Sequence, residues 1–350
     1  MNTSKNTGIY TPQQLRFLKK LNAKLSCVNT RDIRPINAKA TVVMLHGYRG
    51  HMRTLDNLMD ELESNNYNIL ACDLPNHGKS VINEEKRGHI ENFKELIQIA
   101  RAMVSINLIL ESKKDFPVFI VGYSMGAVIA LRLLQTKPNL AKKISGVICI
   151  GLPLEVDHNI SKKLKRYKWL ILPLLPLLRK YYPHLSVHDP KKSENGREIF
   201  ESPEVVSDPL FHKGPMSLHV ALEFYNETNA ITDEIKKIST PILFVHGEND
   251  KYAPFKAVKK AYIKIRSSDK TLHKFNAEHD ITNQNKESVI DIISWLDLKV
   301  SEENRECSNF CVYERKNALS LKIIKIKKMY SFFLSESKKI LRKKLKEKSL

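Results

Sequence analysis

The pattern Gly-x-Ser-x-Gly occurs at residues 122–126, with Ser124 at its centre. An apolar, β-branched run precedes it and a helix-forming run follows it, so we expect a strand, a sharp turn and a helix in that order. Such a turn projects the serine hydroxyl at the carboxyl edge of a sheet. The free N–H groups of the helix N-terminus then face developing negative charge. The pattern therefore predicts a nucleophilic serine that attacks a carbonyl carbon.

A serine nucleophile needs a base within hydrogen-bond reach and a carboxylate that holds the base in one tautomer. Asp250 follows Ser124 in the chain, in a loop just after a strand-like run, and His279 lies in the loop after the next such run. Serine, acid and histidine follow one another in this order in α/β hydrolases. We therefore predict Asp250 as the acid and His279 as the base.

Other histidines also lie near the ends of predicted strands. His246 precedes a glycine at a strand end, which favours a structural role, and His273 falls within a strand. His46 and His77 lie in loops at the expected active edge, so position alone leaves both open. His279 is preferred because it follows the last strand and precedes the last helix.

An oxyanion hole needs two backbone N–H groups aimed at the developing charge. The residue after the nucleophile, Met125, supplies one of them. The loop His46-Gly47-Tyr48 follows an earlier buried strand, and we predict the N–H of Tyr48 as the second donor. The alternative interpretation of His46-Gly47 is a simple turn.

The elements that position these residues alternate between strands and helices. Apolar runs predict strands near 40–47, 67–73, 118–121, 144–151, 241–247 and 271–275. Apolar residues at helical spacing predict helices near 55–62, 90–104 and 288–300, and another after 126. This alternation predicts a mostly parallel central sheet with helices on both faces. Before residue 40 we expect a short helix around Leu15, Leu18 and Leu21 and two weak edge strands.

The alternation stops between residues 155 and 238, where we predict no strand. This stretch contains the run 169–178, ten residues in which two prolines interrupt apolar side chains, which is too short to span a bilayer. The run is interpreted as a core helix of an inserted subdomain or as a lid beside an acyl entrance. We therefore divide the chain into a basic N-terminal segment (1–40), a core (41–154 and 239–300), a helical lid insertion (155–238) and a basic amphipathic tail (301–350).

The net charge is +20, and half of it lies in residues 313–350, which hold 13 Lys or Arg and 3 Glu. Apolar residues share one helical face of this segment, which is typical of a helix packed on the core or lying on an anionic membrane. We expect the membrane contact, and no nucleic-acid module is recognisable. No run of about 20 apolar residues predicts a spanning helix. The start lacks the apolar core of a signal peptide, so we expect a cytoplasmic protein with peripheral membrane contact.

The five cysteines do not suggest a disulfide framework. Cys72 and Cys149 sit in strand-like runs and are expected to be buried thiols. Cys307 and Cys311 have no other metal ligands nearby in the sequence, so they do not predict a metal site. We expect no metal and no organic cofactor.

Taken together, these motifs resemble the monoacylglycerol lipase and lysophospholipase group of the α/β-hydrolase superfamily, which is classified with serine aminopeptidases. The resemblance runs from about residue 40 to 298. The matching stretches are 45–47, 73–80, 122–126, 207–210, 246–250 and 278–279. It implies Ser124 as nucleophile, Asp250 as acid, His279 as base, and Tyr48 and Met125 as the oxyanion hole. The group usually has a small residue where Tyr48 stands and a histidine where Tyr123 stands, and these departures bear on the substrate.

The predicted function is hydrolysis of a lipid carboxylic ester, a monoacylglycerol or a lysophospholipid, through an acyl-enzyme on Ser124. One alternative is a short-chain carboxylesterase, thioesterase or peptidase on the same triad. Another is a non-catalytic, hydrolase-like protein that docks on membranes. Epoxide and haloalkane hydrolysis are disfavoured because that chemistry needs a carboxylate in place of Ser124.

Overall fold

The computed structural model describes residue 25 and residues 28–110, 116–154, 186–188 and 207–310. The helix predicted around Leu15, the apolar run 169–178 and nearly all of the basic tail lie outside these residues. Membrane contact by the tail stays a prediction, which vesicle binding before and after deletion of 313–350 would test. In the described part of the chain, no helix combines the length and apolar character needed to cross a bilayer.

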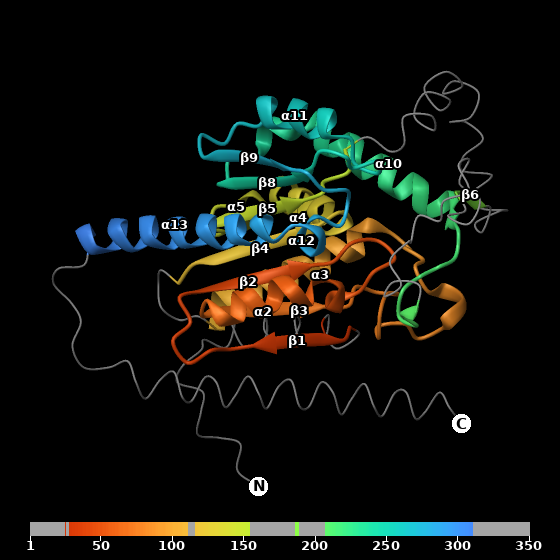
Figure 1. Ribbon diagram of the computed structural model, residues 1–350, viewed down its shortest axis with the longest axis horizontal. Coiled ribbons are helices and arrows are strands. Elements are labelled where there is room, and N and C mark those ends of the chain that lie inside the picture. The colour runs from red at the N-terminus through yellow and green to blue at the C-terminus, as the bar shows by residue number, and fades with distance from the viewer. Residues whose placement is uncertain (1–24, 26–27, 111–115, 155–185, 189–206, 311–350) are drawn as a thin grey trace, which may run out of the picture.

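A seven-stranded sheet forms the centre of the molecule (Figure 1). Its strand order is β1-β3-β2-β4-β5-β8-β9, and only β1 runs antiparallel to its neighbour. The strands β2, β3, β4, β5 and β8 are buried almost throughout, as expected of β-branched runs covered on both faces. The strands are β1 (Thr30–Ile33), β2 (Ala40–Leu45), β3 (Tyr67–Cys72), β4 (Val118–Tyr123), β5 (Gly146–Ile150), β8 (Ile242–Gly247) and β9 (Lys270–Phe275).

Helices cover both faces of this sheet, each over its own apolar core. One face carries α3 (Phe93–Leu110), α4 (Met125–Thr136), α10 (Leu218–Asp233) and α11 (Phe255–Lys264). The other carries α2 (Asp56–Ser64), α12 (Ile281–Gln284) and α13 (Lys286–Phe310). Shorter elements are η1 (Met52–Leu55), η2 (Glu84–Lys86), α5 (Pro138–Ala141) and η4 (Ile235–Lys237). The predicted buried thiols, Cys72 and Cys149, lie in strands of this core and are free and buried.

The prediction that residues 155–238 contain no strand is wrong. Two short strands, β6 (Ser186–His188) and β7 (Met216–Ser217), pair antiparallel in a separate two-stranded sheet. Elements of three and two residues are too short to produce an alternating pattern in the sequence.

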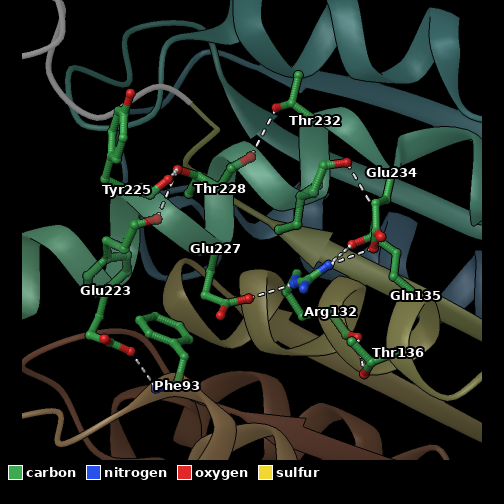
Figure 2. A network of polar contacts seen from close by, with 12 residues as sticks. Phe93, Arg132, Gln135, Thr136, Glu223, Tyr225, Glu227, Thr228, Thr232 and Glu234 are labelled. Carbon is green, nitrogen blue, oxygen red and sulfur yellow. Dashed lines mark hydrogen bonds and ion pairs between the residues drawn. The ribbon is translucent and has the colours of Figure 1, made fainter. Parts of the chain in front are cut away.

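Helix α10, which lies inside the predicted insertion, is fixed to the core by ion pairs and hydrogen bonds (Figure 2). The Arg132 guanidinium on α4 lies 2.6 Å from the Glu227 carboxylate and 3.0 Å from that of Glu234. Gln135 donates to the Ile231 carbonyl at 3.1 Å. The α10 part of the insertion is therefore packed against the core.

Both ends of the predicted core extend further than the sequence pattern indicates. In the predicted N-terminal segment, the described residues form one edge strand, β1, instead of the two expected. Helix α13 continues to Phe310, so the boundary expected at residue 300 falls inside a helix. In the sequence, the apolar spacing that marks this helix stops at Val300 and the next nine residues are mostly polar, so the pattern carries no signal for where the helix ends.

Candidate active site

Ser124 lies in the turn between β4 and α4, where the backbone has an unusual conformation. Its φ is +51° and its ψ is −112°, a region that residues other than glycine rarely occupy. The surroundings hold this strain, because the Ser124 N–H donates to the Ile150 carbonyl at 2.8 Å and the Ser124 carbonyl accepts from the Ala127 N–H at 3.0 Å. The turn therefore presents the Ser124 hydroxyl at the carboxyl edge of the sheet.

Gly126 is required here by a close approach of two backbones. A β-carbon at this position would lie 2.0 Å from the Leu45 carbonyl oxygen of the neighbouring strand. No ordinary side chain can occupy that space, so the first turn of α4 approaches β2 only because residue 126 is glycine.

The structure brings the three predicted side chains into one hydrogen-bonded row. Nε2 of His279 lies 3.0 Å from Oγ of Ser124, and Nδ1 of His279 lies 2.7 Å from Oδ2 of Asp250. With the Nδ1 proton donated to Asp250, the Nε2 lone pair faces the serine hydroxyl. This arrangement can take a proton from Ser124.

Asp250 is fixed and shielded by its own loop after β8. Its side chain has no exposure to solvent. Oδ1 accepts from the N–H groups of Tyr252 and Ala253 at 2.9 and 2.8 Å, which leaves Oδ2 for His279. The two backbone donors and the histidine thus engage both oxygens of Asp250 and fix the orientation of the group.

Tyr123 supports the histidine in a way that the sequence did not reveal. Its hydroxyl donates to the backbone carbonyl of His279 at 3.1 Å. Burial raises the pKa of Tyr123 well above its usual value, and the carboxylates of Asp280 and Asp250 raise it further. The phenol therefore stays protonated and remains a donor. The signal in the sequence was the tyrosine itself, in a position where the resembling group has histidine.

The geometry separates His279 from the other candidate histidines. Both ring nitrogens of His46 are engaged, Nδ1 with the Gly47 carbonyl at 2.7 Å and Nε2 with the Leu74 N–H at 2.9 Å. His246 lies 2.6 Å from the Ala253 carbonyl through Nε2. Burial lowers the pKa of His46 to about 4 and also lowers that of His246.

The two remaining histidines also lie apart from the serine. His77 uses Nδ1 to contact the Pro75 carbonyl at 2.9 Å, and burial lowers its pKa to about 3. His273 lies on the edge strand β9 and pairs with Asp291 at 2.8 Å. Among the five candidate histidines, His279 is the one whose ring lies within hydrogen-bond distance of the Ser124 hydroxyl.

The two predicted oxyanion-hole residues flank the serine from different elements. Met125 is the first residue of α4, where N–H groups have no acceptor within the helix. Gly47, which precedes Tyr48, packs so closely that a β-carbon on it would lie 3.3 Å from Cβ of Ser124. The Tyr48 ring points toward α10 and packs edge-to-face on Phe224, with 5.6 Å between ring centroids.

Comparison with known proteins identifies the family. The pattern of the Hydrolase_4 family, described as serine aminopeptidase S33, matches residues 36–286, well over half of the chain. The chain belongs to this family. As an S33 family member it is a serine hydrolase, and the α/β-hydrolase fold predicted from the sequence is confirmed.

Individual relatives of this S33 family member are distant in sequence. The monoacylglycerol lipase of Mycolicibacterium smegmatis is 22% identical over 265 residues, which cover 74% of this chain and 88% of the relative. Phospholipase YtpA of Bacillus subtilis is 24% identical over 70% of this chain and 89% of its own length. The crystal structure of Paleococcus ferrophilus monoacylglycerol lipase superposes with a TM-score of 0.61 at 22% identity, over 78% of this chain and 98% of that chain.

The residues that the structure describes include no cluster of three or more His, Cys, Asp or Glu suited to a metal ion. The contacts among Ser124, His279 and Asp250 support acyl transfer through a serine.

Proposed function

We propose that the protein hydrolyses carboxylic esters of lipids, with Ser124 as nucleophile, His279 as base and Asp250 as the acid that orients it. The observation that carries this proposal is the continuous contact from Ser124 Oγ through the His279 ring to the buried Asp250 carboxylate, at 3.0 and 2.7 Å. A nucleophile, its base and an orienting group within hydrogen-bond reach are what acyl transfer requires.

In the proposed reaction, Nε2 of His279 takes the Ser124 proton as Oγ attacks the ester carbonyl carbon. The imidazolium that forms is stabilised by Asp250, whose Oδ2 already contacts Nδ1. His279 then returns the proton to the departing alcohol, which leaves an acyl-enzyme on Ser124. Water, deprotonated by the same histidine, attacks the acyl-enzyme and releases the carboxylic acid and the free serine.

The negative charge on the carbonyl oxygen is proposed to be stabilised by the backbone N–H groups of Met125 and Tyr48. Two features support this: Met125 begins a helix, and Gly47 packs against Ser124 so that the next peptide lies beside the nucleophile. Removing one such donor from a comparable site lowers kcat by about 10²–10³-fold.

The substrate class in this proposal is a monoacylglycerol or a lysophospholipid. Its support is the names of two relatives that align over most of their length, a monoacylglycerol lipase and a phospholipase. Because both are only 22–24% identical to this chain, they favour the class of lipid ester and leave the head group open.

The test is labelling of the purified protein by a fluorophosphonate that reacts with activated serines, alongside Ser124→Ala and alongside wild type incubated with a long-chain monoacylglycerol. We expect labelling of wild type, none of Ser124→Ala, and slower labelling with the lipid. If the lipid does not slow labelling, the proposed lipid substrate is wrong, but the assignment as a serine hydrolase stands. Equal labelling of wild type and Ser124→Ala would contradict the assignment of the nucleophile.

A further inference from the structure

The short loop 48–51 carries one proposed oxyanion donor, and two different parts of the molecule hold it in place. On its upstream side the His46 ring accepts from the Leu74 N–H at 2.9 Å. On its downstream side the Met52 N–H donates to the Asp73 carboxylate at 2.9 Å. Both anchors belong to the core and fix only the ends of the loop.

The middle of the loop is held by residues 208–212, which lie more than 150 positions further along the chain. The carboxylate Oδ2 of Asp208 lies 2.6 Å from Nε2 of His51. The His212 N–H donates to the Arg49 carbonyl at 2.9 Å, and the Arg49 guanidinium reaches back to the His212 carbonyl at 3.3 Å. In Figure 1 this green segment, which leads into α10, runs beside the orange loops at the same end of the sheet.

Residue 49 shows why these contacts matter. Arg49 has a φ of +70°, in the left-handed region that residues other than glycine adopt uncommonly and at some cost. Two of the contacts that accompany this conformation are those with His212, one to the Arg49 carbonyl and one from its guanidinium. Arg49 immediately follows Tyr48, so the 208–212 segment contacts the residue next to the proposed oxyanion donor.

The Asp208–His51 contact is also the one that fixes the His51 ring. The ring is buried, with 4% of its side chain exposed. Its other nitrogen, Nδ1, is buried and makes no hydrogen bond with the residues that the structure describes. Oδ1 of Asp208 accepts from the Leu210 N–H at 2.8 Å, so the carboxylate itself is oriented. Thr54 in turn donates to the His51 carbonyl through its hydroxyl at 2.7 Å and continues the contact toward α2.

We propose that Asp208 and His51 are positioning residues, which hold the loop 48–51 so that the Tyr48 N–H faces the oxyanion. This inference rests on the proposed function, because it assigns these residues to the same reaction. It predicts that breaking the contact lowers kcat while KM changes little. A misoriented N–H stabilises the oxyanion of the transition state less well, whereas it contributes little to binding of the ground-state ester.

The experiment compares Asp208→Ala with Glu227→Ala on a small, water-soluble ester. Glu227 is a matched control, because it lies in the same insertion, pairs with Arg132 at 2.6 Å and has a similar side-chain exposure of 21% against 26% (Figure 2). Thermal unfolding establishes the temperature at which every variant is folded. We expect kcat to fall at least about 10-fold in Asp208→Ala and to stay within about 2-fold in Glu227→Ala, with KM unchanged in both.

Two further variants keep the inference testable. Asp208→Asn retains one oxygen that can accept from His51, so its kcat should lie between those of wild type and Asp208→Ala. His51→Ala breaks the same contact from the other side, so it should match Asp208→Ala in kcat, and the double variant should be no slower than either single variant.

The inference is overturned if Asp208→Ala and His51→Ala lose no more kcat than Glu227→Ala, or if the two losses multiply in the double variant. It is also overturned if KM alone changes, because that places the contact in substrate binding. Failure of the proposed function looks different: wild type itself would then show no hydrolysis that depends on Ser124.

Discussion

The elbow, residues 122–126, and the loop 48–51 each supply one proposed oxyanion donor, but they are built in opposite ways. The elbow is assembled from consecutive residues between β4 and α4, and buried core surrounds it. The loop is fixed at its ends by the core and in its middle by residues 208–212. One donor is therefore set by local sequence and the other by a contact between distant segments.

This difference predicts where each region tolerates change. The elbow has no free space, so substitutions in it should lower the stability of the fold. The loop is surrounded by side chains that can move, so substitutions in it should lower catalytic activity while the protein stays folded.

The largest effect is expected from alanine at two glycines, one in each region. In Gly126→Ala the new β-carbon would meet the Leu45 carbonyl oxygen at 2.0 Å, so the backbones of β2 and α4 must separate. In Gly50→Ala the nearest atoms are side-chain atoms of Thr54 at 3.3 Å, which can give way. We expect Gly126→Ala to lower the free energy of unfolding by at least about 3 kcal/mol and Gly50→Ala to change it by less than about 1 kcal/mol.

Urea unfolding followed by circular dichroism measures both values. If Gly126→Ala is as stable as Gly50→Ala, the elbow can accommodate a β-carbon, and the close packing inferred at Gly126 is wrong. A large loss in Gly50→Ala would instead show that the loop is as tightly packed as the elbow.

A smaller effect is expected from pH, and it distinguishes the same two regions. Burial lowers the pKa of His46, beneath the loop, from 6.5 to about 4. Between these values the unfolded chain binds a proton that the folded protein does not, so stability is full above about pH 6.5 and falls as pH drops toward 4. Linkage gives a loss of about 2 kcal/mol from this histidine at pH 5. At the elbow, Tyr123 has a raised pKa and stays protonated throughout this window.

The measurement is the free energy of unfolding at pH 7 and pH 5 for wild type, His46→Gln and Tyr123→Phe. The drop between the two pH values should be smaller in His46→Gln and unchanged in Tyr123→Phe, whatever each substitution does to stability at pH 7. An equal drop in all three proteins would mean that folding does not lower the pKa of His46.

The contrast between the regions also explains what the sequence could reveal. The strands around the elbow are buried β-branched runs, which the sequence pattern predicts. The candidates Ser124, Asp250 and His279 each follow a predicted strand, so they could also be proposed from the sequence. The sequence favoured His279 over His46 and His77 by its place after the last strand, but the contacts that distinguish the three rings come from the fold alone.

The contacts between the loop 48–51 and residues 208–212 could not be predicted from the sequence, for a related reason. His51 and Asp208 are separated by 157 positions, and each is an ordinary polar residue in its own surroundings. Only the fold brings them together. The same limit applies to Tyr123, whose bond to the His279 carbonyl joins residues 156 positions apart.

The smallest effect is expected from removing one hydroxyl in each region. Tyr123→Phe deletes the donor to the His279 carbonyl, and a bond of this kind contributes about 1 kcal/mol, so kcat/KM should fall about 5-fold. Tyr48→Phe removes a hydroxyl that makes no hydrogen bond with the described residues, and the proposed donor at this position is the backbone N–H. Its kcat/KM should therefore stay within about 2-fold of wild type. Both values are measured on the same soluble ester. A larger loss in Tyr48→Phe than in Tyr123→Phe would reverse the comparison, because it would mean that the Tyr48 hydroxyl contacts the substrate and that the loop contributes its side chain as well as its backbone.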